Sequence, residues 1–157
     1  MVLVDGDDEL LGRHSFKVFN HIYTKNNVDI VYSNHLQFYT HTKQVYRGWS
    51  QPYSEDDKRK NRYRDVPQKI AHLRTFKAKL FLKIKVEDLK DLNGEWYTST
   101  YDEVICLPML EMSCGRNMYI DEYFYLYNFG LGTNDLQVDK GLQKSIADEV
   151  KFRRKKY

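Results

Sequence analysis

An acidic segment near the first residue is the first candidate for chemistry. Asp5, Asp7 and Asp8, with Gly6 among them, follow directly after the apolar run 1–4. Carboxylate oxygens are the ligands that Mg²⁺ and Mn²⁺ prefer, and a glycine lets a ligand approach the backbone closely. The segment therefore predicts a divalent-metal site after a buried strand. An acidic turn that only caps the next helix is an equally simple interpretation.

A second pair of carboxylates, Asp102 and Glu103, stands at the predicted start of an apolar helix. The positive end of the helix dipole keeps a carboxylate ionised, and an ionised carboxylate can accept a proton from an alcohol. Helix capping is the simpler interpretation, because Ser99 with Asp102 and Thr100 with Glu103 approximate a capping box. The pair is therefore a candidate general base with a structural alternative.

His72 and Arg74 are the third candidate. Two residues apart, they reach the same anion if the segment is extended, whereas on a regular helix they diverge by about 200°. A basic pair that faces an acidic metal site would suit a diphosphate. The apolar spacing predicts a helix over 70–84, however, and two surface side chains are then the simpler interpretation.

Several further elements must position these residues. We expect strands at 1–4, at 28–39 (one or two) and at 118–126. We expect a helix at 9–23 capped by Asp8, a short one at 86–92 and a buried one over 104–112 that Gly115 closes. Polar residues predict a long, mobile loop or weak helix at 47–67, a glycine-rich loop at 128–135 and an amphipathic C-terminal helix at 136–157.

Length and composition favour one globular domain over residues 1–157. Hydrophobic residues make up 41% and charged residues 30% of the chain, which is ordinary for a folded protein. No apolar run approaches the roughly 18 residues that span a bilayer, and we recognise no signal peptide. Cys106 and Cys114 lie too far apart on one helix for a disulfide, so we expect reduced, buried thiols and a cytoplasmic location.

Charge patterning gives a weaker signal. Basic runs at 58–64 and 151–156 could bind nucleic acid, but acidic neighbours and a helix end favour solvated faces. Glu111 lies deep in the apolar helix, where a carboxylate needs a buried Arg or Lys as its partner.

Together these pieces resemble the family 2 glycosyltransferases of the GT-A fold. The resemblance rests on Val2 to Leu10 with its DxD-like Asp5-Gly6-Asp7, on His72 to Lys77, on Tyr101-Asp102-Glu103 with Pro108 to Met112, and on Tyr125 to Asn128 followed by Asn134-Asp135. These segments occur in the order expected for the family and span nearly the whole chain.

The resemblance implies a role for each candidate residue. Asp5 and Asp7 would hold Mn²⁺ or Mg²⁺ against the diphosphate of a nucleotide-diphospho-sugar donor, with Asp7 the likelier direct ligand. Asp102 would be the catalytic base that deprotonates a hydroxyl of a glycan or other acceptor, and transfer would invert the anomeric centre. Substrate-binding roles are implied for Asp8, His72, Arg74 and Glu103.

The implied fold is an α/β, partial GT-A fold: a mixed sheet flanked by helices that lacks the N-terminal nucleotide-binding βαβ units. The chain then corresponds to the acceptor-side part, as a truncated form, a half enzyme or a remnant. We expect its first strand to remain uncovered and available for association.

Two alternatives remain open. A haloacid-dehalogenase-like phosphatase also places Asp-x-Asp after an apolar strand, although Glu9 stands where that pattern expects Thr or Val. A non-catalytic module could instead keep the fold and bind nucleic acid or a protein partner through the basic runs.

Overall fold

The computed structural model describes residues 1–130, 139–152 and 157. In these residues six strands form one mixed, curled sheet in the order β1-β5-β3-β6-β2, with β4 paired to β3. The strands are β1 (Val2–Leu3), β2 (Glu9–Leu10), β3 (Ile30–Tyr39), β4 (Gln44–Arg47), β5 (Arg74–Phe76) and β6 (Asn117–Phe129). The β3 and β6 strands run parallel, and the other pairs are antiparallel.

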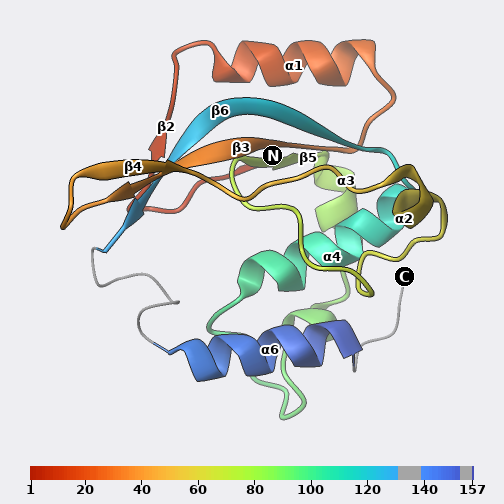
Figure 1. Cartoon of the computed structure of the whole chain (residues 1–157). Helices are drawn as coiled ribbons and strands as arrows, with labels where there is room; N and C mark the ends of the chain where they lie inside the picture. Colours follow the sequence, from red (N-terminus) through yellow and green to blue (C-terminus); the bar gives the residue numbers. More distant parts are fainter. Residues whose placement is uncertain (131–138, 153–156) are drawn as a thin grey trace.

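Helices cover both faces of this sheet (Figure 1). The α1 helix (Ser15–Lys25) lies alone on one face, whereas α4 (Tyr101–Ser113) lies on the other, with α6 (Lys140–Phe152) beyond it. Three short helical pieces lie on the α4 side: α2 (Glu55–Arg59), α3 (Ala78–Phe81) and the 3₁₀ turn η1 (Val86–Leu89). The molecule is therefore α/β with a mixed sheet between helices, as expected.

Each face of the sheet packs on its own core. Along β3, Ile30 and Tyr32 contact the core under α4, while the intervening Val31 contacts the core under α1. This alternation is the period of two that a strand requires. The α4 helix supplies Leu107, Leu110 and their apolar neighbours to the larger core. It ends at Cys114 and Gly115, which both have positive φ.

Two predicted helices are confirmed only in part: α1 covers 15–23 of the expected 9–23, and α3 covers only 78–81 of the expected 70–84. Residues 9–23 form β2 and then α1, because the Asp8 carboxylate accepts hydrogen bonds from the Tyr125 hydroxyl and the Asn128 amide instead of capping a helix. Residues 70–84 are extended through β5, since Thr75 pairs with Val31 of β3 and Val2 of β1. Only α3 remains helical there, because strand pairing outweighs the local apolar spacing.

Several smaller expectations also change. No capping box forms: Thr100 has a φ of 58°, and its hydroxyl donates to the Gln143 carbonyl. Cys106 is buried as expected, but Cys114 is exposed; both are free thiols. The 47–67 segment contains α2, which Ser54 caps by accepting from the Asp57 amide.

Other expected elements keep their type but change their bounds, and the short helix at 86–92 is the 3₁₀ turn η1. The 118–126 strand is confirmed and extends over the longer β6. The 128–135 loop and the 136–157 helix fall partly outside the described residues; α6 occupies 140–152. Among the described helices, none is long and apolar enough to cross a membrane.

Candidate functional site

The extended course of β5 brings His72 and Arg74 together. The Arg74 Nη2 group lies 3.0 Å from His72 Nδ1, so the pair adopts the arrangement that an extended segment allows. Arg74 is buried and His72 is mostly buried, with 3% and 12% of their side chains exposed. The predicted surface location for these two residues is therefore wrong.

Arg74 connects the two carboxylate motifs of the sequence. Its Nη2 lies 3.6 Å from Oδ2 of Asp5, and its Nη1 lies 3.2 Å from Oδ2 of Asp102. Burial alone would lower the pKa of Arg74, but the negative charges of Asp102 and Asp5 raise it. The guanidinium thus stays charged and holds the acidic loop against the first turn of α4.

Tyrosine hydroxyls fix the acidic loop. The Tyr101 hydroxyl donates to Oδ1 of Asp5 at 2.8 Å, and the Tyr125 hydroxyl donates to Oδ2 of Asp8 at 2.8 Å. The Asp5 amide in turn donates to the Tyr125 oxygen at 2.9 Å. Burial, followed by the nearby Asp5, raises the pKa of Tyr101, so this hydroxyl remains a donor.

The structure groups Asp5, Asp8 and His72 as possible metal ligands. One donor atom from each lies within 4.8 Å of the others. Burial raises the pKa of Asp8 to about 6, although hydrogen bonds from Asn128 and Tyr125 oppose the shift. Burial and the charge of Arg74 lower the pKa of His72 well below its usual value, so its imidazole is neutral and able to coordinate.

Asp7, which the resemblance favours as the direct ligand, does not belong to this group. Its backbone carbonyl accepts a hydrogen bond from the Asn128 side chain at 2.8 Å. In the described structure Asp8, which was expected to bind substrate, replaces Asp7 as the second carboxylate of this group, beside Asp5.

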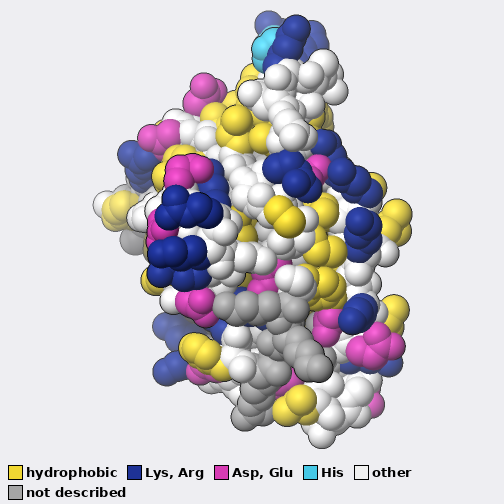
Figure 2. Space-filling view, turned by 90° about the vertical axis from the view of Figure 1, so that its right-hand side faces the viewer, with side chains coloured by type: hydrophobic (Ala, Val, Ile, Leu, Met, Phe, Trp, Pro, Cys, Tyr) yellow, Lys and Arg dark blue, Asp and Glu magenta, His cyan; other side chains and the backbone are white. Residues whose placement is uncertain are grey.

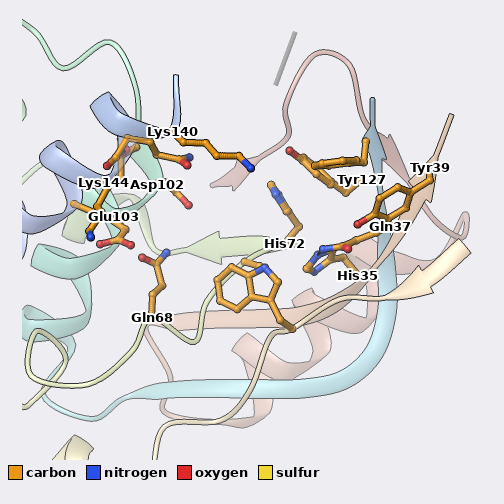
Figure 3. Close-up of a pocket in the computed structure, with 16 residues that line it drawn as sticks. His35, Gln37, Tyr39, Gln68, His72, Asp102, Glu103, Tyr127, Lys140 and Lys144 are labelled. Carbon is orange, nitrogen blue, oxygen red and sulfur yellow. Dashed lines mark hydrogen bonds between the residues drawn. The ribbon is translucent and has the colours of Figure 1, made fainter. Parts of the chain in front are cut away.

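A cleft of about 600 Å³ opens beside this cluster. Figure 3 shows it between α4 and α6 on one side and the ends of β3 and β6 on the other. Asp102 points into it from the first turn of α4, and His72 faces it from below. The two residues line the same cleft, whereas Asp5, Asp7 and Asp8 do not line it.

Aromatic and polar side chains that sequence reasoning missed complete the cleft. They are His35, Gln37, Tyr39, Trp49, Gln68, Tyr127, Phe129, Lys140 and Lys144. Five of them stand at or beside the ends of β3, β4 and β6. No local spacing in the sequence identifies these residues, because they become neighbours only when β3 pairs with β6.

His35 is the most buried of these residues, with 1% of its surface exposed. Burial and the charge of Arg74 lower its pKa to about 4, so it is neutral at physiological pH. Gly48 lies against the ring: a Cβ at this position would be 2.3 to 2.5 Å from three ring atoms. A glycine is therefore needed for the backbone to pass His35.

Glu103 also lines the cleft, but its carboxylate pairs with Lys151 of α6 at 3.2 Å. Burial raises its pKa, and Lys151 opposes the shift. The ion pair connects α4 to α6. A contact with substrate would have to be made beside this pair.

The first basic run is largely neutralised. Lys58 pairs with Glu55, and Arg59, Lys60 and Arg62 all pair with Asp56. Arg64 is buried and binds Glu111 through two nitrogens at 2.8 and 3.0 Å. This confirms the buried cation expected for Glu111 and shows that Arg64 is not on a solvated face.

Figure 2 shows one end of the molecule, where Lys and Arg side chains form separate groups with Asp and Glu between them. A nucleic-acid site uses a continuous basic surface. The described part of this face does not present one.

Comparison with known proteins adds no relative: no protein-family model matches the chain, and no curated protein matches it.

Proposed function

We propose that this chain acts as an inverting glycosyltransferase of the GT-A type. It would transfer a sugar from a nucleotide-diphospho-sugar to an acceptor hydroxyl with Mn²⁺ or Mg²⁺. The observation that carries the proposal is the position of Arg74. Arg74 lies 3.6 Å from Asp5 of the DxD-like loop and 3.2 Å from Asp102, which lines the cleft.

Asp102 supplies the base in this reaction. Its carboxylate lies 3.2 Å from Arg74 in the first turn of α4, and the side chain points into the cleft (Figure 3). It accepts the proton of the acceptor hydroxyl as that oxygen forms a bond to the anomeric carbon. The bond to the nucleoside diphosphate breaks, its electron pair leaves with the diphosphate, and the anomeric centre is inverted.

The residues present fit a divalent ion. Asp5 and Asp8 offer oxygens and a neutral His72 offers a nitrogen, a mixed donor set that suits Mn²⁺ better than Mg²⁺. When bound, the ion would neutralise negative charge on the departing diphosphate. Arg74, buried beside Asp5, adds a permanent positive charge on the same side.

Donor turnover by the full chain tests this function. We expect release of nucleoside diphosphate from at least one of UDP-glucose, UDP-galactose, UDP-N-acetylglucosamine and GDP-mannose, with Mn²⁺ and a mixture of saccharide acceptors. Asp102→Asn should lower kcat by about 10²–10⁴, the range for loss of a general base. The amide keeps an oxygen for Arg74, so the fold should persist.

Glu122→Gln is the matched control, since Glu122 is exposed on β6 and outside the cleft. It should leave kcat unchanged. Turnover that survives Asp102→Asn would remove Asp102 from the reaction. A chain that releases no nucleoside diphosphate from any of the four donors would overturn the proposed function.

A further inference from the structure

The cleft has an aromatic wall that the transfer chemistry does not explain. Trp49, Tyr39, Tyr127 and Phe129 line it. Trp49 is 46% exposed, and the Tyr127 ring stacks on His72 with centroids 5.3 Å apart. Flat, rigid rings offer a surface on which the C–H face of a sugar ring can pack at little entropic cost.

Two polar atoms at the cleft lack partners within the described structure. They are Nδ1 of His35 and Oε1 of Gln68, and both are buried. The side-chain nitrogen of Gln37 lies 3.4 Å from the other ring nitrogen of His35, Nε2. A hydrogen bond donated by Gln37 to Nε2 places the proton of the neutral ring on Nδ1, which is then a donor. A buried polar group without a partner is costly. A hydroxyl group can accept from one such atom and donate to the other.

Two lysines that line the cleft have no ion pair within the described residues. Asp102 is paired with Arg74, and Glu103 is paired with Lys151. Lys140 and Lys144 are four residues apart on α6, so they share one face of that helix, and both line the cleft. Neither has an ion-pair partner within residues 1–130, 139–152 and 157.

The two lysines stand at the beginning of α6, where a cation is unfavourable beside the helix dipole. The Asp139 side chain caps this end by accepting from the Leu142 amide at 2.8 Å, and it does not line the cleft. Figure 3 shows Lys140 extending from α6 over the cleft. Lys144 lies on the other side, beside Glu103, so an anion in the cleft would meet Lys140.

We propose that the acceptor is an anionic saccharide, a sugar that carries a carboxylate or a phosphate. This inference rests on the proposed function. The sugar ring packs on the aromatic wall beside Trp49, hydroxyl groups satisfy His35 and Gln68, and the anionic group binds Lys140, with Lys144 adding positive charge to the same end of the cleft. The acceptor hydroxyl then faces Asp102 on the α4 side of the cleft.

Calorimetric titration of the full chain at low salt, without donor or metal, tests the charge. The probes are methyl β-D-glucuronide, glucose 6-phosphate and the neutral methyl β-D-glucoside, with inorganic phosphate as the anion alone. We expect at least one anionic sugar to bind about tenfold or more tightly than both the neutral sugar and phosphate, the size of one charged hydrogen bond. Added salt should weaken that binding.

Matched variants test the residues. Lys140→Met with Lys144→Met should remove the preference for the anionic sugar, whereas Lys17→Met with Lys25→Met, an equal loss of charge on α1, should keep it. Trp49→Leu should weaken binding of every sugar. Trp96→Leu should not, since Trp96 is exposed and outside the cleft.

Four results would overturn the inference: equal affinity for the neutral sugar, phosphate alone binding as tightly as the anionic sugar, no binding of any probe, or unchanged binding after both lysines are replaced. The assay needs no donor and no metal. Saccharide binding without any donor turnover would therefore overturn the proposed transfer reaction alone, and turnover without charge preference would overturn this inference alone.

Discussion

Arg74 is a buried cation with two carboxylate neighbours, and this arrangement decides which substitutions at the site are informative. Removing one partner of a buried charge leaves the other uncompensated. Truncation of Asp5 or Asp102 to alanine would therefore mix loss of chemistry with loss of stability. The amide variants keep an oxygen beside Arg74 and separate the two effects.

The metal ligands can be distinguished residue by residue. Titration of the full chain with Mn²⁺ alone, followed by paramagnetic broadening in NMR spectra, should show weaker binding for Asp5→Asn and Asp8→Asn, by about tenfold or more. Asp7→Asn is the adjacent control, because Asp7 lies outside the three-residue group. A greater loss for Asp7→Asn than for Asp8→Asn would return the direct ligand to the position that the DxD resemblance favours.

The lowered pKa of His35 predicts that the stability of the folded chain depends on pH. Its pKa is about 4 in the folded chain and 6.5 ordinarily, so below pH 6.5 the unfolded chain binds a proton that the folded chain does not. Stability is therefore retained above pH 6.5 and falls toward pH 4, by about 3 kcal/mol at 1.36 kcal/mol per pKa unit. His72 acts in the same direction, whereas Asp8, with its raised pKa, opposes both.

Urea unfolding of the wild type and His35→Gln between pH 8 and pH 4 measures this contribution. The free energy of unfolding should fall more steeply with acid in the wild type than in the variant, because glutamine cannot bind the proton. Identical pH profiles for the two proteins would show that His35 titrates normally in the folded chain.

At the scale of elements, one buried ion pair connects three parts of the chain. Arg64 follows α2, binds Glu111 of α4 and donates to the Val150 carbonyl of α6. Only 2% of the Arg64 side chain and none of the Glu111 side chain is exposed. Neither charge can be solvated by water, so each depends on the other.

Breaking this pair should cost far more than breaking a surface pair. Arg64→Met should lower the free energy of unfolding by about 3–5 kcal/mol, and adding Glu111→Leu should restore much of the loss. Arg62→Met, in the same basic run but 41% exposed, should cost less than about 1 kcal/mol. Equal losses for Arg64→Met and Arg62→Met in urea unfolding would contradict the role of burial.

At the scale of the whole molecule, β1 is one exposed edge of the sheet, and β2 is another. The β1 strand pairs with β5 on one side and is a terminal strand of the described sheet order. Met1, Val2 and Val4 are 55%, 37% and 43% exposed. An edge strand with exposed apolar side chains is a template for pairing with another chain.

We therefore expect the isolated chain to self-associate through β1. Sedimentation velocity should show mass that increases with concentration, and Val2→Lys should reduce it, since lysine on an edge strand opposes pairing. Leu82→Lys is the control, because Leu82 is 78% exposed but lies after α3. A monomer at all concentrations, or equal effects of the two variants, would exclude this edge as the contact.

The sequence by itself determined much of the local structure and the chemical types at the site. The apolar run of α4, the strands β3 and β6 and the need for a cation beside Glu111 follow from residue type and period, because these report one element's surroundings. Asp5, Asp8, His72, Arg74 and Asp102 were recognisable as acids, bases and possible ligands before any was placed in space.

Only the tertiary structure decided which of these residues meet. His72 and Arg74 share one side because β5 pairs with β1 and β3, although the local spacing favours a helix. Asp8 does not cap a helix and instead accepts a hydrogen bond from Tyr125, which is 117 residues away. The cleft likewise joins β3, β6 and α6. Such contacts depend on strand pairing and helix packing between distant segments, and no local period records them.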